Sequence, residues 1–406
     1  MTKLEQLLEQ LCPNGVEYKE FGEIATISRG ASPRPIKSFL TDRENGVHWI
    51  KIGDVKTGAK YIESTDEYIT LEGAKKSRAV KKGDFILSNS MSFGRPYILK
   101  IDGYIHDGWL SISGFEQNLL SDFLYYVLNS SFVQAEMRKR ASFGGAVQNL
   151  NADIVRGLTL PVPPLEVQAE IVRILDTFTE HTTELTTELA NRKKQYEYYR
   201  DALFCCANYE KKVVTEIADT YIGLVTTMTK HYVPNGVKLI HNSDVKENRF
   251  EFSKDTFLDE EFAEKNKTRK HKIDDIITVH TGDVGTSAVI DKDLDGSLGF
   301  ATIVSRIKDK KVVLPKYLCY YLNSHQNKYN IVSMIKGDRN NLNLKDFNRL
   351  TIPVPPIEEQ QRIVDILDRF DKLCNDISEG LPAEIEARQK QYEYYRDKLL
   401  TFTMKE

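Results

Sequence analysis

The sequence predicts an α+β protein in which two mixed α/β globular domains are joined by two long helices. Three observations support this fold class. A heptad pattern continues for more than thirty residues in the middle of the chain, the second half of the chain repeats words of the first half, and a proline-rich segment precedes each predicted helix. An internal duplication of this kind predicts two related halves within a single chain, and these halves have pseudo-twofold symmetry if their two helices pack antiparallel as a coiled coil.

The central helix is predicted by apolar residues that recur at alternating steps of four and three from Ile171 to Leu203. At about 1.5 Å per residue, a helix that runs from Leu165 to Leu203 spans ~60 Å. We expect its tyrosines to pack along the seam rather than to form an aromatic binding site. The predicted seam of the first helix is Ile171, Leu175, Phe178, Leu185, Leu189, Tyr196, Tyr199 and Leu203. The predicted seam of the second is Ile363, Leu367, Phe370, Ile377, Leu381, Ile385, Tyr392, Tyr395 and Leu399.

The duplication is visible in repeated words. The segment at 158–164 (LTLPVPP) returns at 350–356 as LTIPVPP, and the segment at 195–201 (QYEYYRD) returns unchanged at 391–397. Together with shorter matches between the globular parts, these words give a repeat of roughly 190 residues. The predicted parts are a short N-terminal helix at 1–16, a first domain at 17–160, a spacer helix at 161–208, a second domain at 209–352 and a second spacer helix at 353–406.

Within the first domain, short apolar runs predict strands at 23–28, 47–52, 84–88 and 97–101, followed by one helix near 121–140. The proline pair before residue 165 ends an extended segment, because a residue that precedes proline is disfavoured in the helical region.

The two predicted rods differ in length. The second rod holds four extra residues near Gly380-Leu381-Pro382, which we interpret as a stutter in the coiled coil. Pro382 suits the first turn of a restarted helix. The first rod holds instead a tandem Thr-Thr-Glu-Leu repeat at 182–189, and one such unit changes the length by about one helical turn, ~6 Å.

Bulk composition is that of a globular protein, with 41% hydrophobic and 28% charged residues and a formal net charge of −3. The predicted domains are nearly neutral: 17–153 holds 18 basic against 17 acidic residues, and 210–346 holds 22 against 20. The rods and the N-terminal tip carry the acidic excess. Any contact with nucleic acid must therefore be local, because the total charge does not supply it.

Membrane insertion and secretion are not expected. No apolar run approaches the ~20 residues of a membrane helix, and charged residues occupy the N-terminus where a signal peptide is apolar. The five cysteines lack metal-ligand spacing, so we expect reduced thiols in a cytoplasmic protein and no metal site.

Catalytic motifs are missing. The segment at 53–60 has the outline of a phosphate-binding loop, but Ala59 stands where the lysine must be. No HExxH, GxSxG, GxGxxG or Asn-Pro-Pro-aromatic motif is present. We therefore predict a chain without catalytic residues and without a cofactor of its own. Two non-enzymatic functions remain from the residues alone, a DNA-binding protein and a structural adaptor with two lectin-like or peptide-binding domains on a coiled coil.

Candidate DNA contacts lie in loops that differ between the two repeats, because arginine, asparagine, glutamine and serine side chains reach base edges while lysine and arginine hold phosphates. In the first domain the candidates are Arg29, Ser32, Arg34, Lys37, Asn89, Ser90, Ser92, Arg95, Lys139, Arg140, Ser142 and Gln148. In the second they are Thr226, Thr227, Lys230, His280, Thr281, Asp283, Lys336, Arg339 and Asn340.

The paired words carry a family resemblance over essentially the whole chain. Two variable domains, each followed by a long helix that begins after Pro-Val-Pro-Pro and ends in Gln-Tyr-Glu-Tyr-Tyr-Arg-Asp, resemble the specificity (S) subunit of type I restriction-modification enzymes. The resemblance implies that each domain is a target recognition domain that reads one half of a split double-stranded DNA site. It also implies that the antiparallel helices act as a spacer.

The same resemblance implies partner subunits. Two methyltransferase subunits bind around the helices and use S-adenosylmethionine, and restriction subunits that use ATP and Mg can join that core. We further hypothesise that the Thr-Thr-Glu-Leu units set the distance between the half-sites, and that the helix near the N-terminus completes the end of the C-terminal rod.

Overall fold

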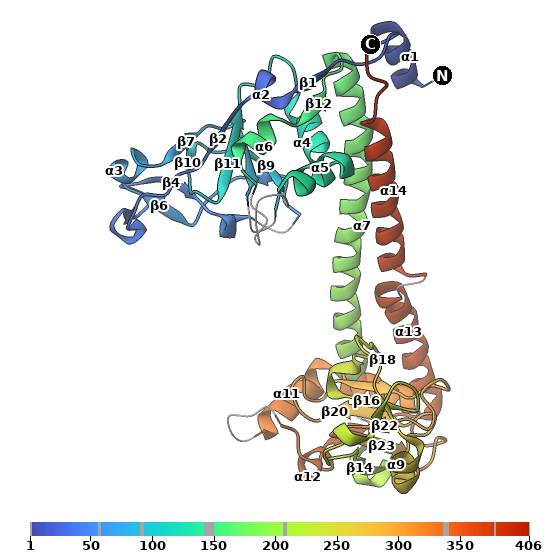
Figure 1. Cartoon of the computed structure of the whole chain (residues 1–406). Coiled ribbons are helices and arrows are strands. Elements are labelled where there is room, and N and C mark those ends of the chain that lie inside the picture. Colours follow the sequence, from blue (N-terminus) through green and yellow to red (C-terminus); the bar gives the residue numbers. More distant parts are fainter. Residues whose placement is uncertain are drawn as a thin grey trace. The chain divides into compact units, whose positions relative to one another are not determined.

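The computed structural model describes residues 2–55, 58–89, 93–141, 150–205, 209–335, 341–376 and 379–405. The chain forms two compact units: Met1–Glu184 with Ile385–Glu406, and Leu185–Glu384. Helix α7 (Leu165–Cys205) is continuous and contributes its first half to one unit and its second half to the other (Figure 1). Each unit thus combines a predicted globular domain with parts of both rods.

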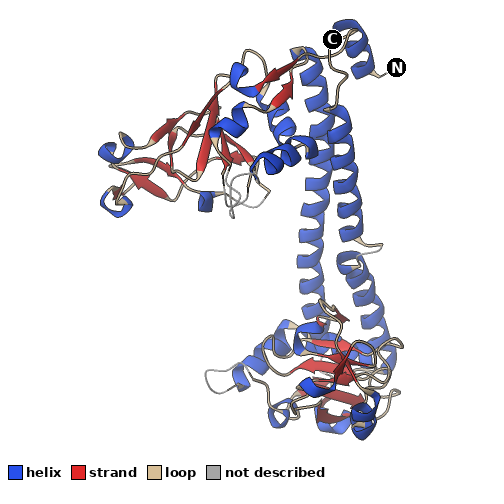
Figure 2. Ribbon diagram, in the orientation of Figure 1, coloured by secondary structure: helices blue, strands red, loops and turns tan. Residues whose placement is uncertain are grey.

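The first unit holds the helices and strands of the N-terminal domain (Figure 2). Its helices are α1 (Lys3–Leu11), α2 (Phe21–Ile24), α3 (Leu71–Ala74), α4 (Ser121–Asn129), α5 (Ser131–Ala141), α6 (Ala152–Arg156) and most of α14 (Leu381–Leu399). Its strands are β1 (Tyr18–Glu20), β2 (Thr26–Arg29), β3 (Leu40–Thr41), β4 (Val47–Ile50), β5 (Tyr61–Ile62), β6 (Glu67–Ile69), β7 (Arg78–Val80), β8 (Phe85–Ser88), β9 (Pro96–Leu99), β10 (Gly103–Ile105), β11 (Trp109–Ser113) and β12 (Thr159–Pro161).

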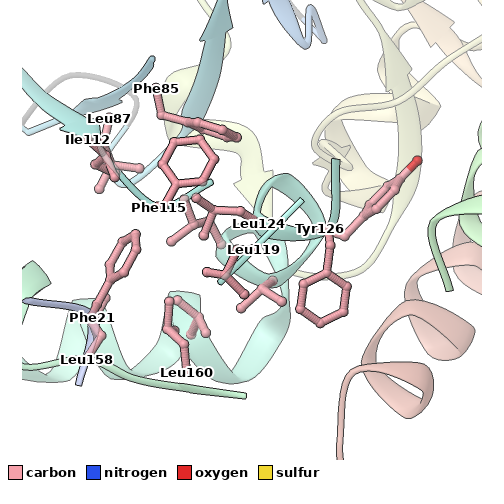
Figure 3. Packing of buried hydrophobic residues seen from close by; sticks show 14 of the residues in the cluster. Phe21, Phe85, Leu87, Ile112, Phe115, Leu119, Leu124, Tyr126, Leu158 and Leu160 are labelled. Carbon is pink, nitrogen blue, oxygen red and sulfur yellow. The ribbon is translucent and has the colours of Figure 1, made fainter. Parts of the chain in front are cut away.

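These strands form two mixed five-stranded sheets, in the orders β3-β6-β4-β10-β7 and β2-β11-β8-β9-β5, and a small β1-β12 pair. The main core lies between the second sheet, the helices α2, α4 and α6, and the start of α7. Figure 3 shows aromatic and leucine side chains of this core, in which the rings of Phe85 and Phe115 meet edge to face at 5.3 Å. Apolar burial of this kind fixes the domain on the helix.

The second unit repeats this plan. Its helices are α8 (Val214–Ile217), α9 (Glu260–Lys265), α10 (Pro315–Leu322), α11 (His325–Met334), α12 (Leu344–Phe347) and α13 (Ile357–Asn375). Its strands are β13 (Lys211–Val213), β14 (Ala218–Ile222), β15 (Tyr232–Val233), β16 (Val237–Ile240), β17 (Val245–Lys246), β18 (Arg249–Phe250), β19 (Phe257–Leu258), β20 (Ile276–Val279), β21 (Ser287–Val289), β22 (Leu298–Gly299), β23 (Thr302–Ile307) and β24 (Thr351–Pro353).

The four-stranded sheets of the second unit, β14-β23-β20-β21 and β15-β19-β16-β22, repeat the first four strands of each sheet in the first unit and lack equivalents of the edge strands β5 and β7. The pair β13-β24 corresponds to β1-β12. The duplication and the mixed α+β fold predicted from the sequence are therefore confirmed.

Each unit contains its own antiparallel pair of helix segments. In the first unit Phe178 of α7 stacks on Tyr395 of α14, with ring centroids 5.4 Å apart, while the later residue His181 lines a pocket with the earlier residue Arg388. In the second unit Tyr199 of α7 stacks in the same way on Phe370 of α13 at 5.7 Å.

The predicted seam residues of α7 are buried or half-buried apart from Tyr199, which is 47% exposed but keeps one ring face on Phe370. In the C-terminal helices, Ile363 and Leu367 are buried, and Phe370, Leu381, Ile385, Tyr392 and Leu399 are half-buried. Tyr395 is 36% exposed and stacks on Phe178, and Ile377 lies outside the described residues. Neighbouring positions on α7, such as Thr183 and Lys194, are exposed, as a heptad seam requires.

The second rod is two helices, which confirms the restart predicted at Pro382, so the four extra residues lie at a break and not within a continuous coiled-coil helix. Helix α13 ends at Asn375 and α14 begins at Leu381. Pro382 lacks an amide hydrogen and is tolerated only in the first turn, so the helix restarts just before it. Gly380 fits this junction because a Cβ there would lie 2.6 Å from the carbonyl oxygen of Asp376.

Two smaller sequence predictions are also wrong in their bounds. The single helix expected near 121–140 is divided into α4 and α5, because Ser130 has extended backbone angles and its hydroxyl contacts the Val127 carbonyl. The strand expected at 23–28 begins only at Thr26, because the preceding residues form the helical turn α2.

Buried glutamines join each domain to its helix in the same way. Gln168 near the start of α7 and Gln360 near the start of α13 are both fully buried. Each side-chain oxygen accepts one backbone N–H, and each amide donates to two backbone carbonyls, over 2.7–2.9 Å. The partners of Gln168 are Leu120, Asn118 and Pro163, and those of Gln360 are Leu314, Val312 and Pro355.

The aspartate of each Gln-Tyr-Glu-Tyr-Tyr-Arg-Asp word performs the same task in both units. Asp397 accepts the backbone N–H of Ser131 at the start of α5, and Asp201 accepts that of His325 at the start of α11, both at 3.0 Å. A carboxylate at a helix N-terminus satisfies a free N–H and opposes the positive end of the helix dipole. The aspartate of each repeated segment therefore has a structural role.

The N-terminal helix packs where the C-terminal rod ends. Thr2 and Glu5 cap α1 reciprocally, and Lys3 forms an ion pair with the buried carboxylate of Glu170 on α7 at 2.8 Å. The side-chain hydrogen bonds from Arg173 and Lys3 lower the pKa of Glu170 to about 2. Val16 pairs with Met404 in a parallel bridge, so the end of the chain joins its beginning. This arrangement supports the hypothesis that α1 completes the rod.

Candidate nucleic-acid interface

In the first unit, three of the predicted contact residues converge on one aspartate. Ser32 donates a hydrogen bond from its hydroxyl to Oδ1 of Asp107 at 2.7 Å, and Arg34 donates to Oδ2 at 3.1 Å. Arg29 donates from Nε to the backbone carbonyl of Asp107 at 3.3 Å. The structure therefore brings these residues together on the loops that follow β2 and precede β11.

Strand pairing brings the two loops together. Strand β2 pairs with β11 so that Arg29 lies opposite Leu110. Gly30 then passes so close to the second loop that a Cβ would lie 2.0 Å from the carbonyl oxygen of His106. The hydroxyl of Ser77 donates to the carbonyl oxygen of Ala31 and fixes the loop from its other side. These contacts hold the loop backbone rigidly.

Asn89 plays a supporting part rather than facing solvent. Its side chain is 3% exposed, and its amide donates to the backbone carbonyl of Asp107 at 2.8 Å. Its own backbone pairs with Gly108 and Leu150. Asn89 is therefore a buried residue that supports the loop carrying Asp107.

The electrostatics of this cluster favour an ionised aspartate beside a neutral histidine. The hydrogen bond from Ser32, with a smaller contribution from Arg34, lowers the pKa of Asp107. Burial lowers the pKa of His106, whose Nδ1 accepts the backbone N–H of Gly108 at 2.8 Å. The carboxylate thus pairs with the Arg34 guanidinium at neutral pH.

The remaining candidates of the first unit are dispersed. Lys37, Arg95 and Lys139 are exposed. Arg140 is tied to structure, because it donates to Glu136 and to the backbone carbonyl of Gly157. Ser90, Ser92, Ser142 and Gln148 lie outside the described residues.

The corresponding loops of the second unit have a different chemistry. Thr226, Thr227 and Lys230 are exposed on the loop after β14. The Thr281 hydroxyl donates to Oδ1 of Asn341 at 3.2 Å and lies 2.9 Å from Nδ1 of His280. Lys336, Arg339 and Asn340 lie outside the described residues.

An asparagine missed from the sequence supports these residues. The side chain of Asn242 accepts the backbone N–H of His280 at 3.0 Å and donates to the carbonyl oxygen of Ala301 at 3.2 Å. Asp283 accepts a hydrogen bond from the Thr286 hydroxyl, which closes its own turn. Burial lowers the pKa of His280, and in place of the Asp107 cluster this unit presents threonines, a histidine and asparagines.

Comparison with known proteins gives the family. The type I restriction modification DNA specificity domain matches the chain twice, at residues 13–194 and 208–387. The chain belongs to this family. The resemblance drawn from the repeated words is thereby confirmed, and the structural-adaptor alternative is not favoured.

Relatives and solved structures of specificity subunits agree with this assignment. The EcoR124I/EcoR124II specificity subunit of Escherichia coli is 36% identical over 71% of this chain and 72% of its own length. A putative type I restriction enzyme specificity subunit of Haemophilus influenzae is 32% identical over 99% of both chains. A chain from a type I restriction-modification system is similar in fold, with a TM-score of 0.68, 18% identity, and coverage of 96% of this chain and 98% of that one.

A second solved structure, the HsdS subunit from Thermoanaerobacter tengcongensis, has a TM-score of 0.51 at 18% identity and covers 96% of both chains. The family assignment implies a non-catalytic role for this specificity subunit. Among the described residues no group of three or more His, Cys, Asp or Glu side chains is arranged to hold a metal ion. Within the same ranges, no helix has both the length and the apolar character needed to cross a membrane.

Sequence reasoning missed Asp107 and Asn242 in this specificity subunit. Asp107 lies 75 residues from Ser32, and Asn242 lies 38 residues from His280, so neither is near in sequence to the candidate that it contacts. A difference between the two repeats could have pointed to Asp107, because Phe300 stands at the corresponding position of the second repeat.

Proposed function

We propose that this chain binds double-stranded DNA and that each unit reads one half of a bipartite site through the loops described above. The proposal rests on a difference between two parts of each unit, the contacts that join domain to helix and the loops that face solvent. The glutamine and aspartate contacts recur in both units, whereas the exposed side chains on the loops after β2 and β14 differ. A repeated frame with two different polar surfaces suits two different half-sites.

The long helices are the proposed docking surface for two methyltransferase subunits. In both copies of the Gln-Tyr-Glu-Tyr-Tyr-Arg-Asp word, the first tyrosine packs inward and the middle one is exposed: Tyr198 is 69% exposed and Tyr394 is 61% exposed. The same exposed aromatic residue in both repeats suits two identical partners, because tyrosine supplies much of the contact energy of protein interfaces.

In this proposal the complex acts in the cytoplasm and its cofactors belong to the partners. The methyltransferase subunits hold S-adenosylmethionine, and restriction subunits, joined through them, use ATP and Mg. The chain contributes sequence recognition and spacing and holds no cofactor.

The test is the methylome of cells that express this chain together with its methyltransferase subunit. The expected result is one bipartite motif, two short half-sites separated by unspecified bases, which is absent when the methyltransferase is expressed without this chain. A continuous motif, or no new methylation, contradicts the proposal.

A further inference from the structure

Arg34 and Asp107 form an exposed ion pair at the tip of the first unit's recognition loops. The Arg34 side chain is 82% exposed, whereas its partner carboxylate is 40% exposed. One terminal nitrogen of the guanidinium donates to Oδ2 of Asp107, and Ser32 occupies Oδ1. An exposed ion pair adds little to stability, about 0–1 kcal/mol, so stability does not explain why so many groups converge here.

Asp107 is held through its backbone as well as its carboxylate, while the arginine side chain is left accessible. The backbone N–H of Asp107 points to the Ser32 hydroxyl at 3.3 Å, and its carbonyl oxygen accepts from Asn89 and Arg29. Asp107 is therefore the fixed member of the pair, and it restricts where the long Arg34 side chain is directed.

In the second unit, the residues at the two corresponding positions do not form an ion pair. Gly30 donates its N–H to the carbonyl oxygen of Trp109, and Gly223 donates in the same way to that of Thr302, which aligns the two loops. Counting along both loops from these bonds places Thr227 at the position of Arg34 and Phe300 at that of Asp107. Scaffold contacts recur in both units, but this pair does not, as expected of a group that reads only one half-site.

We propose that Arg34 is a base-reading residue of the first unit, specific for guanine in the major groove, and that Asp107 is the positioning residue that directs it. The inference rests on the proposed function. A guanidinium has five N–H donors, so the bond to Asp107 leaves a pair of parallel donors that matches O6 and N7 of guanine. A residue that only neutralised a phosphate would need neither this orientation nor the aspartate.

The test is selection from a library of randomised double-stranded DNA by the complex of this chain with its methyltransferase subunits. The wild-type complex should select a bipartite motif with guanine at one fixed position of one half-site. Arg34→Ala and Arg34→Lys should both lose that single preference and bind the wild-type site about 5- to 150-fold more weakly. The Lys variant keeps the charge but not the paired donors.

The companion variants separate the roles. Asp107→Asn should weaken the same guanine preference and leave the second half-site unchanged. The matched control Arg43→Ala, which removes another exposed arginine of the same unit, should leave the motif intact.

An unchanged motif in Arg34→Ala overturns the proposal, as does full binding by Arg34→Lys, which would make Arg34 a phosphate contact. If the wild-type complex selects no bipartite motif, the proposed function itself fails, and the two failures are distinguishable.

Discussion

Gln168 and Gln360 illustrate how single buried residues attach a domain to a rod. Each glutamine satisfies three backbone groups at the proline-rich entrance to a helix. Burial without such partners costs about 1–3 kcal/mol for a polar group, which is a large part of the stability of a domain.

Gln360→Leu should therefore lower the free energy of unfolding by about 1–3 kcal/mol for each backbone group left without a partner, and reduce the melting temperature of the chain. The neighbouring Gln361 is exposed and contacts only Asp365 on its own helix, so Gln361→Leu is the matched control and should stay within about 0.5 kcal/mol of wild type. Thermal unfolding followed by circular dichroism measures both. Equal shifts in the two variants would show that the buried glutamine has no special part.

At the scale of elements, each helix pair uses one face for packing and leaves another exposed, which we propose as the docking face for partner subunits. The stacked pairs Phe178–Tyr395 and Tyr199–Phe370 hold the helix segments together within their units. The exposed Tyr198 and Tyr394 contact the neighbouring seam tyrosines edge to face, at 5.5 and 5.3 Å, and leave most of their own surface open.

Tyr198→Ala and Tyr394→Ala should each weaken the binding of one methyltransferase subunit, because an exposed aromatic residue buried at an interface contributes about 2 kcal/mol or more. The double variant should fail to assemble with two partners, while its folding stays unchanged. Tyr329→Ala, which removes a tyrosine that is 72% exposed on α11, is the control. Sedimentation velocity of the mixed subunits gives the stoichiometry. Full assembly by the double variant would place the docking surface elsewhere.

At the scale of the whole molecule, α7 runs unbroken from the first unit into the second. The tandem Thr-Thr-Glu-Leu repeat at 182–189 lies at the point where the units divide, whereas the other rod is interrupted after Asn375. Our hypothesis is therefore that the length of α7 sets the spacing of the two half-sites.

Inserting a third Thr-Thr-Glu-Leu unit should lengthen α7 by about one turn, ~6 Å, and enlarge the gap of the methylated motif by about one or two base pairs. Both half-site sequences should stay the same, because the recognition loops are untouched. Methylome sequencing measures the gap, and Thr187→Ala serves as a control that keeps the helix length. An unchanged gap would rule out a ruler function for this helix.

The sequence by itself determined the duplication, the long heptad helix, the proline-rich helix entrances and the family. These features are short repeated sequence segments or periodic patterns, so they can be recognised from residues that are close together in the sequence. It also indicated which loops diverge, and therefore where Arg29, Ser32 and Arg34 would matter.

Only the tertiary structure decided which side chains meet. Asp107 lies more than seventy residues from Arg34, and strand pairing between β2 and β11 brings them together. The same holds for Asn89, which the sequence offered as an exposed contact and the fold buries. The sequence predicted a helix restart near Pro382, but the close approach of Gly380 to the Asp376 carbonyl oxygen is seen only in the fold. Hydrogen-bond partners distant in sequence leave no periodic trace, so these contacts were out of reach of the sequence pattern.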